Sequence, residues 1–114
     1  MKASAPGKII LFGEHAVVYN RPALAVPVNQ VQVEVEVSDS PTQGIWIHAP
    51  VVDLHAELST LPSDHPIASV ILMVFSPPFT SSQFLKDRMN GETGVEINIT
   101  STIPVAAGLG SGAA

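Results

Sequence analysis

A run of strictly alternating residues constrains the fold of this chain more than any other feature of its sequence. Residues 31–37 read Val-Gln-Val-Glu-Val-Glu-Val, which places four valines on one side of an extended backbone and three polar side chains on the other. Because a shift of one residue would expose all four valines, the pairing register of this strand should be firm. The chain is therefore expected to contain a β-sheet with one buried face.

Other short apolar runs are bounded by glycine and proline, which is typical of strands and turns. Residues 9–12 and 23–26 are expected to form buried strands. The polar residues 39–44 are expected to form a turn that leads into a return strand at residues 45–48. Residues 95–99 alternate again and predict a further strand.

Apolar residues then recur at helical spacing after Pro66, which suits the first turn of a helix. The predicted apolar stripe consists of Ile67, Val70, Ile71 and Val74. Residues 81–90 are expected to form a second short helix, whereas the pattern of residues 49–62 is ambiguous. The fold class is therefore α+β, with mostly antiparallel strands.

Charged residues make up only 13% of the 114 residues, about half the usual share of a soluble domain. A hydrophobic fraction of 46% excludes intrinsic disorder, which requires low hydrophobicity and high charge. So few charged groups suggest that the chain pairs with more protein or is the front part of something longer.

Composition also excludes several kinds of partner and site. The chain has no cysteine, so disulfides, thiolate metal sites and cysteine nucleophiles are impossible. The net charge of −5 argues against nucleic-acid binding, and no apolar run is long enough to cross a membrane. Because no signal peptide is recognisable at the N-terminus, a cytoplasmic location is expected.

Residues 104–114, Pro-Val-Ala-Ala-Gly-Leu-Gly-Ser-Gly-Ala-Ala, follow a predicted strand and consist mostly of residues with a small side chain or none. A glycine-rich loop that enters a helix can bind phosphate through backbone N–H groups, although a plain tight turn would have a similar composition. A Walker A loop is excluded because no Lys-Ser or Lys-Thr follows the glycines. The dinucleotide pattern Gly-x-Gly-x-x-Ala is present at residues 108–113, but residues 104–107 separate it from its strand.

A second segment near the N-terminus also carries candidate chemistry. Lys8 adjoins an apolar strand, where a cation can hold phosphate or can simply extend to solvent at a strand edge. Glu14 and His15 supply an acceptor and a titratable donor after a glycine, although such pairs are usually solvated. The remaining histidines, at positions 48, 55 and 65, lack metal-ligand spacing and are interpreted as structural or surface groups.

Together, these two segments resemble the GHMP small-molecule kinases and, within that superfamily, the mevalonate kinase family. Residues 104–114 match the phosphate loop Pro-x-x-x-Gly-Leu-Gly-Ser-Ser-Ala-Ala at every fixed position except Gly112. Ala-Pro-Gly-Lys at residues 5–8, followed by Gly-Glu-His-Ala-Val-Val-Tyr at residues 13–19, is similar to the N-terminus of mevalonate kinases. The resemblance runs through the whole chain but is specific only at its two ends.

The resemblance implies that residues 1–114 form part of the α+β N-terminal, ATP-binding domain of the GHMP type, a ribosomal protein S5 domain 2-like fold, with a C-terminal domain absent. It implies a kinase that uses ATP and Mg²⁺ to phosphorylate the 5-hydroxyl of mevalonate in isoprenoid precursor synthesis. Lys8 is the implied catalytic residue, and Glu14 and His15 are the implied substrate-binding residues. The implied nucleotide-binding residues are Ser101, Ala106, Ala107, Gly108, Leu109, Gly110, Ser111 and Gly112.

Gly112 stands where the family has a serine whose hydroxyl binds Mg²⁺, so no metal ligand is expected within the chain. The family's other Mg²⁺ ligand and its general base follow this region, so the 114 residues alone are expected to be inactive and to self-associate through exposed apolar faces. The full-length protein is a possible homodimer. Two alternatives remain: a non-catalytic module that binds nucleotide or a partner protein, and a fragment of a dinucleotide-binding oxidoreductase.

Overall fold

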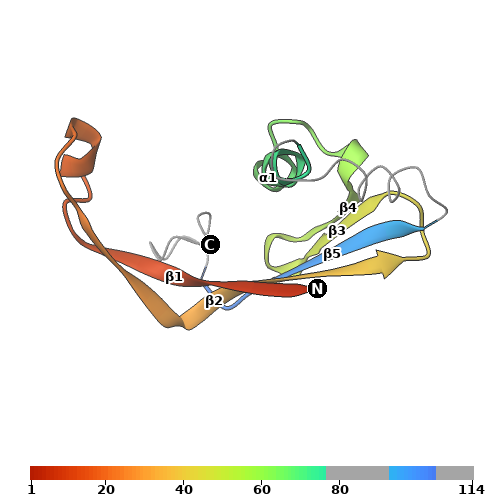
Figure 1. Ribbon diagram of the computed structural model, residues 1–114, viewed down its shortest axis with the longest axis horizontal. Helices are drawn as coiled ribbons and strands as arrows, with labels where there is room; N and C mark the ends of the chain where they lie inside the picture. The colour runs from red at the N-terminus through yellow and green to blue at the C-terminus, as the bar shows by residue number, and fades with distance from the viewer. Residues whose placement is uncertain (77–92, 105–114) are drawn as a thin grey trace. The chain divides into compact units, whose positions relative to one another are not determined.

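The computed structural model describes residues 1–76 and 93–104, in which strands predominate (Figure 1). The expected helix at residues 81–90 and the glycine-rich segment from residue 105 onward lie outside the described residues. In chain order the elements are β1 (Lys2–Phe12), η1 (Ala16–Tyr19), β2 (Leu24–Ser40), β3 (Ile45–Ala49), η2 (Pro50–Val52), β4 (Leu54–Glu57), η3 (Leu58–Thr60), α1 (Pro66–Val74) and β5 (Gly94–Ser101).

The strands form one mixed sheet in the order β1-β2-β5-β3-β4. Strand β3 pairs antiparallel with β4 and parallel with β5, in a register that sets Ile45 opposite Val95. The predicted strand at residues 45–48 is thus confirmed, but its expected place beside residues 31–37 is wrong because β5 lies between β2 and β3. Alternation along a segment reveals a strand and its faces, but not which distant strand will pair with it.

The chain divides into two compact units, each described here by itself. The helical unit comprises Met1 and residues 36–99, and the hairpin unit comprises residues 2–35 and 100–114. In the helical unit, α1 lies over one face of the strands (Figure 1). The buried apolar side chains of this unit are Ile45, Ile47, Ala49, Ala68, Ile71, Val95 and Ile97.

Helix α1 begins with Pro66 at its first position, as predicted, and ends at Val74. Its buried residues are Ala68 and Ile71, whereas Val70 and Val74 are 59% and 52% exposed. The predicted stripe is therefore wrong for these two valines. Nearly every residue of α1 is apolar, so the helical period alone cannot indicate which side faces the sheet. The side of α1 that faces away from the sheet is an exposed apolar surface, as the low charge of the chain predicts.

In the hairpin unit, β1 and β2 are joined by residues 13–23, with η1 at the tip (Figure 1). Residues 24–26 and the predicted strand at residues 31–37 belong to one continuous strand, β2, which runs through Pro27. The expected burial of residues 23–26 is wrong, because Leu24 is 51% exposed. The extended φ of proline is compatible with a strand, so its presence does not force a break. The alternation is confirmed, because Val33 is buried and Gln32 is exposed.

Residues 9–12 form part of β1, as predicted, but they are not buried. Ile9, Leu11 and Phe12 are 38%, 50% and 73% exposed. The prediction of a buried strand is wrong because an apolar run favours extended backbone without specifying what covers it. Within the described residues, no helix is both long enough and apolar enough to span a bilayer.

Candidate functional site

Lys8 lies in β1 and is half-buried, next to the buried Gly7. Among the described residues, its ammonium makes no hydrogen bond or ion pair. Lys2, on the same strand, instead holds the Glu34 carboxylate, with Nζ 2.9 Å from Oε1. Lys8 is therefore a half-buried residue whose ammonium has no carboxylate against it in the described part of the chain, an arrangement that suits an anionic ligand.

Glu14 and His15 lie in the turn between β1 and η1, where both are exposed. The turn requires glycine at position 13, because φ is +85° and an added Cβ would lie 2.6 Å from the Pro22 carbonyl oxygen. The Val17 amide donates to the Gly13 carbonyl at 2.9 Å, and this hydrogen bond closes the turn that contains Glu14 and His15. The two candidate substrate-binding residues thus sit on a constrained backbone.

The C-terminal end of η1 is also constrained by a left-handed residue and by backbone hydrogen bonds. Asn20 has a φ of +60°, a left-handed conformation that asparagine tolerates well, and its amide donates to the Val17 carbonyl at 3.1 Å. The Arg21 amide donates to the Ala16 carbonyl at 3.2 Å. These backbone bonds stabilise the tip, and within the described part of the chain its exposed side chains remain available to a ligand.

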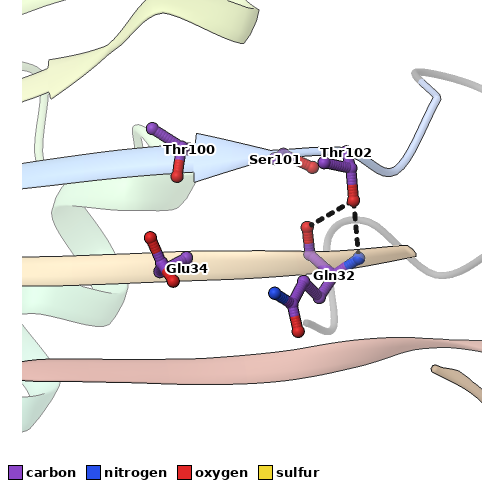
Figure 2. Close-up of a pocket in the computed structure, with 5 residues that line it drawn as sticks. All are labelled: Gln32, Glu34, Thr100, Ser101 and Thr102. Atoms are coloured by element: carbon purple, nitrogen blue, oxygen red, sulfur yellow. Dashed lines mark hydrogen bonds between the residues drawn. The ribbon is translucent and has the colours of Figure 1, made fainter. Parts of the chain in front are cut away.

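A polar hollow of about 140 Å³ lies where the end of β5 meets β2 in the hairpin unit, as Figure 2 shows. Its lining residues are Gln32, Glu34, Thr100, Ser101 and Thr102. Thr102 and Gln32 are tied by three hydrogen bonds. The Gln32 amide donates to Thr102 Oγ1 at 2.9 Å, and the Gln32 carbonyl accepts from Thr102 Oγ1 at 3.3 Å and from the Thr102 amide at 2.9 Å.

Ser101, a predicted nucleotide-binding residue, is half-buried in this hollow. Its Oγ accepts a hydrogen bond from the Ile103 amide at 3.1 Å, and Ile103 is only 2% exposed. The hydroxyl therefore stabilises the backbone where β5 ends. The Glu34 carboxylate also lines the hollow, so the hollow by itself does not favour a phosphate.

The Thr102–Gln32 contact leads to a prediction about stability. We expect Thr102→Val to lower the free energy of unfolding by about 1 kcal/mol, because the Gln32 amide loses its side-chain acceptor. Thr100→Val is the matched control, since Thr100 is exposed and its hydroxyl makes no hydrogen bond with another described residue. Urea denaturation of the two variants measures the difference, and equal stabilities would show that the contact contributes nothing.

The structure places Lys8, Glu14, His15 and Ser101 in the same compact unit. No hydrogen bond or ion pair joins any two of them within the described part of the chain. The predicted nucleotide-binding residues 106–112 lie outside the described residues. Over residues 1–76 and 93–104, no group of three or more histidine, aspartate or glutamate side chains could hold a metal ion.

Thr102 and Gln32, whose hydrogen bonds fix the chain just after β5, were not among the site residues predicted from sequence. A usable signal was present, because Thr-Ser-Thr at residues 100–102 follows an alternating strand. Hydroxyl side chains at such a point commonly bond to nearby backbone groups.

Comparison with known proteins identifies similar sequences. The family model described as the GHMP kinases N terminal domain matches residues 79–114. A mevalonate kinase of Pyrococcus abyssi is 37% identical over 98% of this chain and 34% of its own length. A mevalonate kinase of Archaeoglobus fulgidus is 36% identical over the whole chain and 34% of its own length.

Solved structures show the same fold. The Methanococcus jannaschii mevalonate kinase has a TM-score of 0.64 and 28% identity over 99% of this chain and 36% of that one. The Streptococcus pneumoniae phosphomevalonate kinase, with a TM-score of 0.66 and 20% identity over 98% of this chain and 32% of that one, shares the fold. The expected α+β fold of the GHMP kinase N-terminal domain is thus confirmed, as a mixed sheet with few helices. The chain is therefore similar to mevalonate kinases over nearly its whole length, matches the N-terminal domain of the GHMP kinases at residues 79–114, and spans about a third of the length of the mevalonate kinases that it matches.

Proposed function

We propose that the protein containing this chain is a mevalonate kinase, which transfers the γ-phosphoryl group of ATP to the 5-hydroxyl of mevalonate in isoprenoid precursor synthesis. The observation that carries this proposal is the 37% identity with the Pyrococcus abyssi mevalonate kinase over 98% of the chain. The resemblance is spread along the chain rather than confined to one motif, which argues against a dinucleotide-binding oxidoreductase.

The chemistry of Lys8 supports the proposal. Phosphoryl transfer depends mainly on positioning and on stabilising negative charge in the transition state. The ammonium of the half-buried Lys8, which has no carboxylate partner among the described residues, can do both for an incoming hydroxyl. In this proposal Lys8 lowers the pKa of the substrate hydroxyl and stabilises the oxygen from which the proton leaves.

Glu14 and His15 have the polarity that mevalonate requires. A carboxylate accepts a hydrogen bond from a hydroxyl, and an imidazole N–H donates one to a carboxylate. Their place on the constrained β1–η1 turn supports a substrate-binding role. The proposed nucleotide-binding groups are Ser101 and the backbone of residues 106–112, and ATP with Mg²⁺ would supply the phosphoryl group and its charge neutralisation.

An assay of the intact protein tests the proposal. With ATP, Mg²⁺ and mevalonate, we expect ADP release that depends on mevalonate and that stops when mevalonate is omitted. ATP binding without turnover would favour the non-catalytic module, and NAD binding that ATP cannot displace would favour the oxidoreductase. A chain limited to residues 1–114 is the negative control, because it is expected to be inactive.

The same proposal includes the setting of the enzyme. We infer a cytoplasmic protein whose partner is the small molecule mevalonate rather than nucleic acid or a membrane, in keeping with its net charge of −5. The full-length protein is proposed as a homodimer. Sedimentation analysis of the intact protein tests this, and a single monomeric species at micromolar concentration would contradict it.

A further inference from the structure

The face of the helical unit that lies opposite its apolar core is polar. Partners in register point their side chains to the same face of a sheet, and so do alternate residues along a strand. On β3, β4 and β5 this rule collects one set of side chains: Trp46, His48, His55, Glu57, Glu96 and Asn98. Of these, His55 is exposed and the others are half-buried.

Two histidines meet at the centre of β3 and β4. His48 and His55 are partners in the antiparallel register, and their Nδ1 atoms lie 3.1 Å apart. The ring centroids are 5.0 Å apart, and the ring planes are inclined at 75°. A hydrogen bond at this position needs a proton on one Nδ1 and a lone pair on the other, so the two Nδ1 atoms face each other.

We propose that His48 and His55 bind a divalent transition-metal ion of the zinc type through their two Nδ1 atoms. At the usual Zn–N length of about 2.0–2.1 Å, nitrogens separated by 3.1 Å subtend about 98° at a shared ion. That angle lies between the right angle of octahedral or square-planar sites and the tetrahedral angle. The separation of the two nitrogens therefore already suits a chelating pair, and rotation of the two rings would direct both lone pairs at the ion.

Ligand chemistry selects the class of ion. Neutral imidazole binds zinc, nickel and copper well, whereas Mg²⁺ and Ca²⁺ prefer oxygen. On metal binding, the ring that donates the present hydrogen bond moves its proton from Nδ1 to Nε2, so both Nδ1 lone pairs become available. Water completes the coordination, because no third histidine or carboxylate joins the pair within the residues that the structure describes.

A metal ion bound at this site would stabilise the pairing of the edge strand β4 with β3. Strand β4 is the edge strand and has only four residues, and it is connected to β3 through the short η2 turn. An ion bound to one histidine from each strand cross-links β4 to β3. Because the site requires both strands in register, the ion binds the folded form preferentially and stabilises the helical unit.

The single tryptophan of the chain provides a reporter, because the Trp46 and His55 ring centroids are 6.0 Å apart. We expect Ni²⁺, added to the intact protein, to quench the fluorescence of Trp46 in a saturable way, and Zn²⁺ to compete with it. Calorimetry with Zn²⁺ alone should give a matching affinity. A Trp46→Phe variant identifies which part of the fluorescence change comes from this site.

Three single variants decide the proposal. His48→Asn and His55→Asn should each weaken Zn²⁺ binding at least tenfold and abolish the Zn²⁺-dependent rise in the thermal midpoint, whereas His15→Asn should not. Because His55 is exposed, His55→Asn is expected to fold even if His48→Asn does not, and it then decides the result alone. Equal Zn²⁺ affinity in His55→Asn and His15→Asn would overturn the proposal.

Discussion

Replacing Lys8 by methionine is expected to lower kcat for mevalonate phosphorylation by about two to three orders of magnitude, while KM for mevalonate changes far less. Methionine keeps the length and apolar stem of the side chain but removes the ammonium. Lys8 is half-buried and its ammonium has no carboxylate partner among the described residues. In the proposed reaction this charge acts mostly on the transition state, so its loss should appear in kcat.

Lys2→Met is the matched control for this prediction. Lys2 lies on the same strand, β1, but its ammonium is paired with Glu34 at 2.9 Å, and its side chain is 57% exposed. Steady-state kinetics of the two variants separate a local effect from a general loss of positive charge. An unchanged kcat in Lys8→Met would remove Lys8 from the chemistry without contradicting the fold.

Gly94→Ala should have the largest effect on stability, lowering the free energy of unfolding by about 3 kcal/mol or preventing folding. An added Cβ would lie 2.0 Å from the Thr42 carbonyl oxygen and 2.5 Å from that of Gly44. Both are backbone atoms, and the Gly44 carbonyl also accepts the Val95 amide at 2.9 Å. Relief of the clash therefore requires the start of β5 to move away from the turn that precedes β3.

Two other substitutions make this effect specific. Thr93→Ala changes an exposed neighbour and should leave stability nearly unchanged. Gly44→Ala should cost less than Gly94→Ala, because its nearest contact is the Glu57 side chain, which can move, although its φ of +100° adds strain. Thermal unfolding monitored by circular dichroism ranks the three variants. A Gly94→Ala midpoint equal to that of Thr93→Ala would contradict the packing at this point.

The elements with strong local patterns could be predicted from sequence. The alternation at residues 31–37 gave the strand and its faces, and Pro66 gave the start of α1. In each case the determinant is local, either a period of two or a residue with a fixed φ. The resemblance at the two ends of the chain gave the family for the same reason, since those motifs are contiguous.

Features that depend on distant partners could not be predicted. The position of β3 between β5 and β4 depends on pairing with residues far along the chain. The exposure of Val70 depends on which side of an almost wholly apolar helix meets the sheet. The pairing of His48 with His55 depends on the hairpin through Pro50–Val52, a region whose sequence pattern was ambiguous.

In the candidate site, too, the local features could be predicted from sequence, whereas the contacts between distant residues could not. The sequence indicated Lys8, Glu14 and His15 by their residue types and by the residues next to them. The structure adds that Glu14 and His15 lie in a constrained turn. The Thr102–Gln32 contact spans most of the chain and leaves no contiguous motif. The catalytic and binding roles themselves remain predictions, to be tested by the kinetics described above.

The position of β5 affects how this protein can be made. It is the last described strand in the sequence, yet it lies between β2 and β3, which precede it by many residues. During synthesis on the ribosome, those two strands emerge without the neighbour that they share. The sheet can close only after residues 94–101 have left the exit tunnel, so the nascent chain depends on an open strand edge staying unpaired with other molecules until then.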